Sequence, residues 1–185
     1  MEITIILIIW ALLMITIWAT YNNLVSKRNQ IENAYGALDA MLKKRYDLLP
    51  NLMKIVKAYT VQHEHELVVL MTLAQQREVN SLSASEKHLI DIQAGTSLNA
   101  VVKALAQLPV LRNDSQFSRL QGAWNEAEEE IAAARRAYNS SIAEYNNAFE
   151  GFPGNMFAKN MNFEHKHVLE TPPEEKENIS SEMMV

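Results

Sequence analysis

The sequence predicts an all-α protein, with an N-terminal transmembrane helix followed by an elongated antiparallel bundle of long helices. Three observations lead to this fold class. The 185 residues include only five glycines and five prolines, so few residues interrupt helices. The N-terminal segment is apolar over a length that spans a membrane. Beyond it, apolar residues recur at spacings of three and four, which is the period of one helix face.

The apolar segment is predicted to be a membrane anchor. From Ile3 to Ala19 the only polar residues are two threonines, whose hydroxyls can bond to the helix's own carbonyls. About 20 helical residues cross a hydrocarbon core of about 30 Å. The alternatives are a cleaved signal peptide, which would have basic N-terminal residues and a shorter apolar core, and a buried helix, which is rarely apolar all round. We therefore assign residues 1–21 to a transmembrane anchor.

Flanking charge predicts the orientation of this anchor. Only Glu2 precedes it, whereas Lys27, Arg28 and the basic run 43–45 follow it. Because positive residues tend to stay in the cytoplasm, we expect the N-terminus outside and the helical domain in the cytoplasm. Residues 27–60 carry seven basic and three acidic residues, which favours contact with anionic lipid headgroups rather than nucleic acid. A merely solvated helix face is the alternative.

The first soluble helix is expected to continue directly from the anchor, because apolar residues from Leu24 to Leu42 share one face and no proline precedes Pro50. Proline suits the first turn of a helix and disfavours helical geometry in the residue before it. Asp47 and Pro50 therefore predict an elbow. A second apolar stripe predicts a helix from Leu49 to Asn80, followed by a connection.

Two further helices are predicted. A short one from Leu98 to Leu108 has Ser97 as its candidate cap. The longest runs from residues 113–115 to Gly151 and pairs antiparallel with the second helix. Trp124, Ile131 and Tyr138 are expected to hold the core of the bundle. The domain assignment is therefore a helical bundle over residues 22–155, an irregular segment over 156–169 and a disordered acidic tail over 170–185.

No pattern of catalytic or metal-binding residues is recognisable. The chain has no cysteine, which excludes disulfides and thiolate metal sites. His63 and His65 would point about 200° apart on a helix and cannot share an ion, and His165 and His167 would bind a transition metal weakly. The glutamates at 128–130 are expected to be solvated. We therefore expect no enzymatic activity, no cofactor and no metal.

Two blocks of the sequence contain a repeated pair, Tyr138-Asn139 and Tyr145-Asn146, seven residues apart on one helix face. Such tyrosines bury their rings and reach a polar edge with their hydroxyls. The pairs are interpreted either as a wet edge of the bundle core or as a stripe that contacts a partner.

Several blocks together resemble the LemA family over residues 21–155. They are YNNLV at 21–25, LKKRYDLLPNL at 42–52, ARRAYN at 134–139, Tyr145-Asn146 and Phe152-Pro153. The sequence differs where the family commonly has a Gly-Phe-Lys-Pro-like segment, since Asn162-Phe163-Glu164-His165 stands there. The resemblance implies a bacterial inner-membrane protein with an α-helical domain, a short extracytoplasmic N-terminus and no established enzymatic activity.

The leading hypothesis is a membrane-bound scaffold or adaptor that self-assembles, most simply into a ring or cage; a slender monomer is the alternative. A second hypothesis is an accessory or regulatory subunit of an envelope quality-control or transport complex. A third, a hydrolase or metal-handling protein, lacks the motifs it needs. The expected partners are membrane lipids, further copies of the chain and an unidentified membrane protein. The candidate partner contacts are Arg45, Asp47, Pro50, Asn51, Arg135, Arg136, Tyr138, Asn139, Tyr145 and Asn146.

Overall fold

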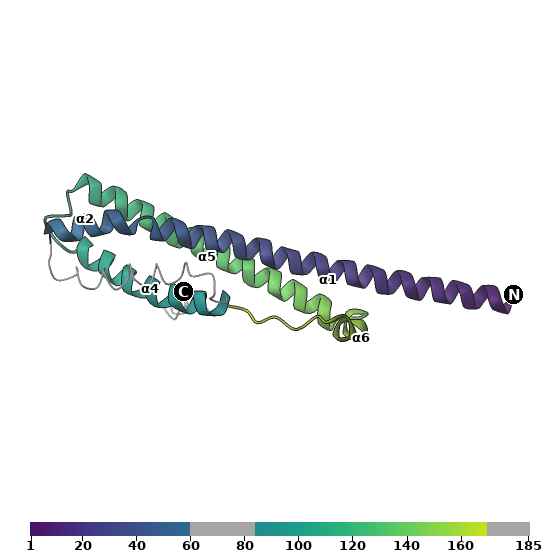
Figure 1. Cartoon of the computed structure of the whole chain (residues 1–185). Helices are drawn as coiled ribbons and strands as arrows, with labels where there is room; N and C mark the ends of the chain where they lie inside the picture. The colour runs from purple at the N-terminus through teal and green to yellow at the C-terminus, as the bar shows by residue number, and fades with distance from the viewer. Residues whose placement is uncertain (60–83, 170–185) are drawn as a thin grey trace, which may run out of the picture. The chain divides into compact units, whose positions relative to one another are not determined.

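The computed structural model describes residues 1–59 and 84–169, and within these ranges it contains helices and no strands (Figure 1). The all-α prediction is confirmed. The elements are α1 (Glu2–Tyr46), α2 (Leu49–Tyr59), α4 (Ala84–Ala106), α5 (Ser115–Glu150), α6 (Gly154–Phe157) and the 3-10 helix η1 (Ala158–Met161). The predicted acidic tail, the histidines at 63 and 65 and most of the predicted second helix lie outside the described residues.

The chain divides into two compact units. Unit 1 comprises residues 1–38 and 133–168, and unit 2 comprises residues 39–132 and 169–185. The long helices α1 and α5 contribute to both units. The packing of each unit is described by itself.

Helix α1 is a single helix of 45 residues, so the apolar segment continues without interruption into the helix that follows it, as predicted (Figure 1). The described chain has one helical stretch that is long and apolar enough to cross a membrane, and it lies at this end. Its large apolar side chains are exposed, for example Leu7 at 62%. The hydroxyls of Thr16 and Thr20 donate to the carbonyl oxygens of Leu12 and Thr16, at 2.8 and 2.7 Å. These bonds satisfy the few polar groups of the segment within the helix.

In unit 1, α1 and α5 pack antiparallel. Lys27 of α1 pairs with Glu144 of α5, and Tyr35, further along α1, contacts the ring of Tyr138, which comes earlier on α5. The buried positions are those of the predicted stripes, three or four residues apart within a face. They include Leu24, Ile31, Leu38, Tyr138, Ile142 and Tyr145.

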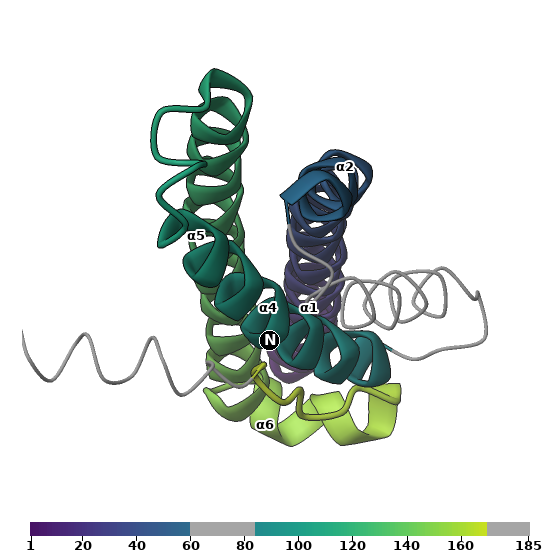
Figure 2. The ribbon, with the colours of Figure 1, turned by 90° about the vertical axis from the view of Figure 1, so that its left-hand side faces the viewer.

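In unit 2, α2, α4 and α5 enclose one apolar core. Figure 2 shows the ribbon of these helices from the end at which α2 lies. The core residues are Leu49, Leu52 and Ile55 of α2, Ala94, Leu98, Val101, Val102 and Leu105 of α4, Leu111 of the connection, and Phe117, Leu120 and Trp124 of α5. The predicted burial of Trp124, and of Ile131 and Tyr138 further along α5, is confirmed. Helix α5 thus packs against the start of the predicted second helix.

The predicted interruption before Pro50 is present, and we call residues 47–51 the elbow. Helix α1 ends at Tyr46 and α2 begins at Leu49. The backbone N–H groups of Asn51 and Leu52 both donate to the carbonyl oxygen of Leu48 at 3.1 Å. Pro50 lies in the first turn of α2, where a missing N–H costs no helical hydrogen bond.

The predicted boundary of the short helix is wrong. Helix α4 extends from Ala84 to Ala106, so Ser97 lies inside it and is not its cap, and residues 84 and 85 are helical rather than part of a connection. The buried face of its first half carries Asp91, Ala94 and Gly95, which continue the spacing of Leu98 and Val101. These residues are polar or small, so apolar periodicity does not reveal the helix there.

Helix α5 begins and ends as predicted, with Asp114 as its N-cap. The Asp114 Oδ1 atom accepts hydrogen bonds from the backbone N–H groups of Gln116 and Phe117 at 2.8 and 2.9 Å. The expectation of an irregular segment from residue 156 is only partly right, because α6 and η1 form helical turns up to Met161. Gly154 permits this compact turn, since a Cβ atom there would collide with the carbonyl oxygen of Ala148.

Candidate functional site

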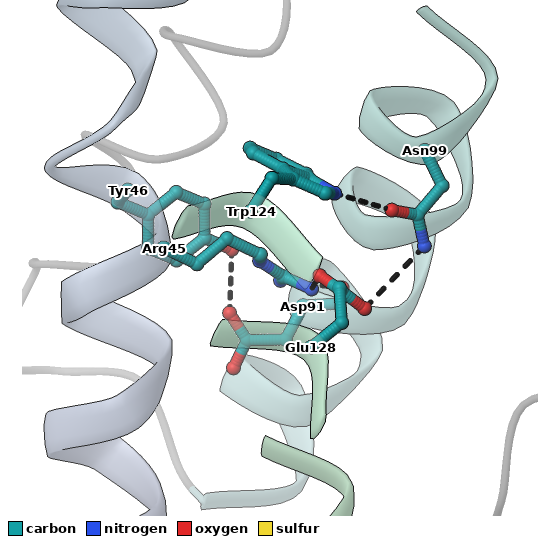
Figure 3. A network of polar contacts seen from close by, with 6 residues as sticks. All are labelled: Arg45, Tyr46, Asp91, Asn99, Trp124 and Glu128. Carbon is teal, nitrogen blue, oxygen red and sulfur yellow. Dashed lines mark hydrogen bonds and ion pairs between the residues drawn. The ribbon is translucent and has the colours of Figure 1, made fainter. Parts of the chain in front are cut away.

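Among the described residues of unit 2, six polar and aromatic side chains form a cluster that we call the polar network (Figure 3). It joins the last turn of α1 to α4 and α5. Its members are Arg45 and Tyr46 of α1, Asp91 and Asn99 of α4, and Trp124 and Glu128 of α5. Sequence reasoning selected Arg45 as a candidate partner contact and did not select the residues that it bonds.

Arg45 is the centre of the polar network and is only 2% exposed. Its Nη1 atom lies 3.1 Å from the Glu128 Oε1 atom, and its Nη2 atom donates to the Asp91 carbonyl oxygen at 3.2 Å. Gly95 of α4 makes room for the guanidinium, since a Cβ atom at this position would lie 2.7 Å from Nη1. A buried charge requires such a partner and such hydrogen bonds, because the interior solvates it poorly.

Two aromatic side chains extend the polar network on either side of Arg45. The Tyr46 hydroxyl donates to Asp91 Oδ1 at 2.6 Å. On the other side, Trp124 Nε1 donates to Asn99 Oδ1 at 2.7 Å, and Asn99 Nδ2 reaches Glu128 Oε2 at 3.4 Å. Burial raises the pKa of the Tyr46 hydroxyl, and the charge of Asp91 raises it further.

The hydrogen bonds of the polar network run between helices rather than towards an open cleft. Each bond fixes the register of one helix against another, because a slip by one residue would leave a buried charge or amide without its partner. The polar network therefore holds the last turn of α1 in a fixed position against α4 and α5.

A second set of ion pairs lies on the surface of unit 2. Lys44 Nζ is 2.8 Å from Glu130 Oε2 and 3.3 Å from Glu126 Oε1. The hydrogen bond with Glu130 is the main reason that the pKa of Lys44 is raised. The expectation that residues 128–130 are solvated is only partly right for Glu128, whose side chain is 30% exposed and pairs with the buried Arg45. Neighbouring residues of the basic run therefore form different pairs: Arg45 forms a buried pair with Glu128, and Lys44 forms surface pairs with Glu126 and Glu130.

In unit 1, the second Tyr-Asn pair binds the chain's own returning segment. The Tyr145 hydroxyl donates to the Glu164 carbonyl oxygen at 2.9 Å. The Asn146 amide donates to the Lys166 carbonyl oxygen at 2.8 Å and accepts from the Lys166 N–H at 3.0 Å. These three bonds fasten residues 164–166 to α5. The ring of Tyr138 in the first pair packs against Tyr35, with centroids 5.7 Å apart.

The remaining predicted contact residues fall into two groups. Asp47, Pro50 and Asn51 are exposed at the elbow of unit 2, whereas Arg135, Arg136 and Asn139 belong to α5 in unit 1. Arg135 is buried, Asn139 is half-buried and Arg136 is exposed. Their contact with a partner stays a prediction.

The elbow borders an open pocket of about 380 Å³ in unit 2. Its lining includes the apolar side chains of Leu48, Ile55 and Leu120 and the basic side chains of Lys54 and Arg119. Asn51, one of the predicted contact residues, also lines it. The pocket therefore combines an apolar surface with two positive charges.

The histidines at the end of the chain show no metal geometry in the described part. The rings of His165 and His167 lie 5.5 Å apart, and His165 Nε2 is 3.3 Å from Glu150 Oε1. Among the described residues, no group of three histidine, aspartate or glutamate side chains is placed to hold an ion.

Sequence reasoning missed Tyr46 of α1 and Glu128 of α5 as members of the polar network. The other residues that it missed, Asp91, Gly95 and Asn99, lie on α4. One signal was available for them. Asp91, Ala94, Leu98, Val101 and Leu105 keep spacings of three and four, so a polar residue continues the apolar face.

A comparison with curated proteins gives no match. The model of the LemA family matches residues 34–182, which is most of the chain. The match includes the elbow block at 42–52, which supplies Arg45 and Tyr46 to the polar network, and the Tyr-Asn pairs of α5. The chain belongs to the LemA family.

Proposed function

We propose that this chain is a non-catalytic helical scaffold, held in the bacterial inner membrane by the first half of α1 and assembled from several copies. The carrying observation is the contrast along α1. Its first 18 residues expose almost every apolar side chain, whereas from Leu24 onward its apolar face is buried against α5. A surface of exposed isoleucine, leucine and tryptophan is unfavourable in water and suits a hydrocarbon environment.

The polar contacts support the scaffold part of the proposal. In the polar network, the charged and amide side chains bond one another across helices, and Tyr145 and Asn146 bond the backbone of a neighbouring segment. Groups used in this way fix the shape of a helical domain. Small exposed side chains on α5, Ala133 and Ala137, leave room for another helix to approach.

Membrane insertion is tested with a charge in the apolar half of α1. Leu13→Arg places a cation near the centre of the segment, which costs about 2.5–3.5 kcal/mol on insertion scales. We expect wild-type protein to remain in membranes after alkaline carbonate extraction and a larger share of Leu13→Arg to be released. Gln30→Arg, exposed on the same helix beyond the apolar segment, is the control. An intact mass that lacks about 2 kDa or more would instead identify a cleaved signal peptide.

The proposed orientation has a separate test. A reporter that is active only in the cytoplasm, fused after Val185, should work, and one that requires export should not. The opposite pattern would place the helical domain outside the cytoplasm and leave the anchor itself intact.

The pocket at the elbow favours one alternative, an accessory subunit that binds a second membrane protein. Its apolar lining and the basic side chains of Lys54 and Arg119 fit a segment with apolar and acidic side chains. A pull-down in mild detergent with Arg119→Glu as control distinguishes the two. A stoichiometric second protein that is lost with Arg119→Glu supports the accessory subunit, whereas recovery of the chain alone supports the scaffold.

A further inference from the structure

The turn that follows α5 exposes large apolar side chains. Phe152 is 83% exposed and Met156, in α6, is 60% exposed. Among the described residues after the end of α1, only three other large apolar side chains are more than half exposed, Leu89, Val110 and Val168. Phe152 and Met156 lie four residues apart in one compact turn. An exposed aromatic ring and an exposed thioether side chain on neighbouring turns favour an apolar or interfacial environment.

This turn lies beside the end of the apolar half of α1, within unit 1. An open groove of about 490 Å³ separates them. One side of it is formed by α1, from Ile15 to Asn23, and the other by residues 147, 148 and 151–154. The ring of Tyr21 also packs edge-on against Phe163, 5.9 Å away. Figure 1 shows α6 beside α1, with the N-terminal part of α1 continuing past it.

The level of the turn coincides with the expected edge of the membrane. The apolar run ends at Ala19, and the exposed amides Asn22 and Asn23 follow it. Exposed Trp18 and Tyr21 stand at this boundary, where aromatic belts of membrane proteins occur. Since the groove joins this stretch of α1 to residues 151–154, the turn stands at the same depth.

We propose that residues 151–157 form a second membrane contact, in which Phe152 and Met156 enter the headgroup region of the leaflet that α1 leaves. The inference rests on the proposed membrane insertion of α1. The occupant of the exposed surface is lipid, because the surface is continuous with the anchor through the groove. Gly154 holds the turn close to α5, so the two side chains project from a fixed base. The contact would set the rotation and depth of α1 in the bilayer.

The absence of cysteine from the sequence permits a direct test. Single cysteines are introduced as Phe152→Cys and Met156→Cys in the full-length protein and labelled with the environment-sensitive dye NBD. The protein is reconstituted in vesicles of phosphatidylcholine and phosphatidylglycerol. Nitroxide groups are placed either at the lipid headgroup or deep in the acyl chain. Leu13→Cys reports the anchor, and Ser140→Cys, exposed on α5 in the same unit, reports a solvated position.

We expect blue-shifted emission at positions 152 and 156, with quenching by headgroup nitroxides several-fold stronger than at Ser140→Cys. Leu13→Cys should be quenched most by the deep nitroxide. Deep quenching at position 13 with solvent-like emission at 152 and 156 would overturn the inference and leave the anchor proposal standing. No lipid quenching at position 13 would overturn the anchor proposal. Blue-shifted emission at 152 and 156 without lipid quenching would identify a protein contact and would also overturn the inference.

Discussion

Gly95 determines how Arg45 fits against α4. A Cβ atom would lie 2.7 Å from the Nη1 atom of Arg45, and this guanidinium is held by Glu128 and the Asp91 carbonyl. We therefore predict that Gly95→Ala lowers the free energy of unfolding by about 1–3 kcal/mol, the usual cost of overpacking. Urea unfolding of the full-length protein in detergent, followed by circular dichroism, measures it.

Gly122 on α5 is the matched control, because the Cβ atom of an alanine at this position would have no neighbouring heavy atom within 4 Å. Gly122→Ala should raise stability by about 0.5–1 kcal/mol through helix propensity alone. In an Arg45→Met background, the penalty of Gly95→Ala should shrink. An equal penalty in both backgrounds would show that Arg45 does not require the space at Gly95.

The raised pKa of the Tyr46 hydroxyl predicts how the stability of the fold changes at alkaline pH. Its pKa is raised above the ordinary value of 10.0 by burial and by Asp91. Below pH about 10 the hydroxyl is protonated in both states; above it, the unfolded chain loses the proton while the folded chain retains it. Stability should therefore fall as pH rises above about 10. Burial raises the pKa of Tyr138 and Tyr145 in the same direction.

The variant Tyr46→Phe tests how much of the loss of stability at alkaline pH is due to Tyr46 rather than to Tyr138 and Tyr145. The variant should be less stable at neutral pH by about 1–3 kcal/mol, because the Asp91 carboxylate loses a hydrogen bond of 2.6 Å. Its stability should decline less between pH 9 and 11 than that of the wild type, in parallel unfolding series at about these pH values. Equal declines would assign the alkaline sensitivity to other groups, Lys44 among them.

Only part of the polar network could be predicted at the level of residues. Arg45 stood out because it belongs to a distinctive block, but a run of Lys43, Lys44 and Arg45 does not reveal which cation is buried. Its acceptors come from helices 46 and 83 residues further along the chain. Such pairings depend on how helices pack, which the spacing of residues along one helix does not determine.

At the level of elements, the start of α5 depends on Asp114. Its carboxylate accepts from the N–H groups of Gln116 and Phe117, which no helical carbonyl can satisfy. Asp114→Ala should lower the free energy of unfolding by about 1 kcal/mol. Asp114→Asn should retain most of this stability, since asparagine caps about as well. Thermal unfolding of both variants measures it, and equal losses would mean that the charge rather than the cap matters.

The boundaries of α1 and α5 could be predicted because each carries a long apolar stripe with a recognisable end. That of α4 could not, since its buried face includes Asp91, Ala94 and Gly95. These residues are buried because they contact other helices. Asp91 accepts a hydrogen bond from the Tyr46 hydroxyl, and Gly95 leaves space for the Arg45 guanidinium. A helix face that is buried through polar and small residues shows its period only when these residues are counted together with the apolar ones.

For the whole molecule, the prediction is self-association. We expect the full-length protein in mild detergent to have a mass, corrected for the micelle, of several chains by light scattering. Ala137→Lys places a charge on the face of small residues of α5 and should reduce this mass. Ala143→Lys, about 120° away on the same helix at about 100° per residue, is the control. A monomer at all concentrations would exclude the scaffold and favour the accessory subunit.

The continuity of α1 has a mechanical consequence. Between the apolar half and the contacts of Lys27 and Tyr35 with α5 there is neither a loop nor a proline at which the helix could bend. Helices respond to a thinner bilayer by tilting. If the apolar half of α1 tilts, the rest of α1 tilts with it, and the part of α5 that packs against α1 rotates by the same angle. Bilayer thickness would thus act directly on the orientation of unit 1.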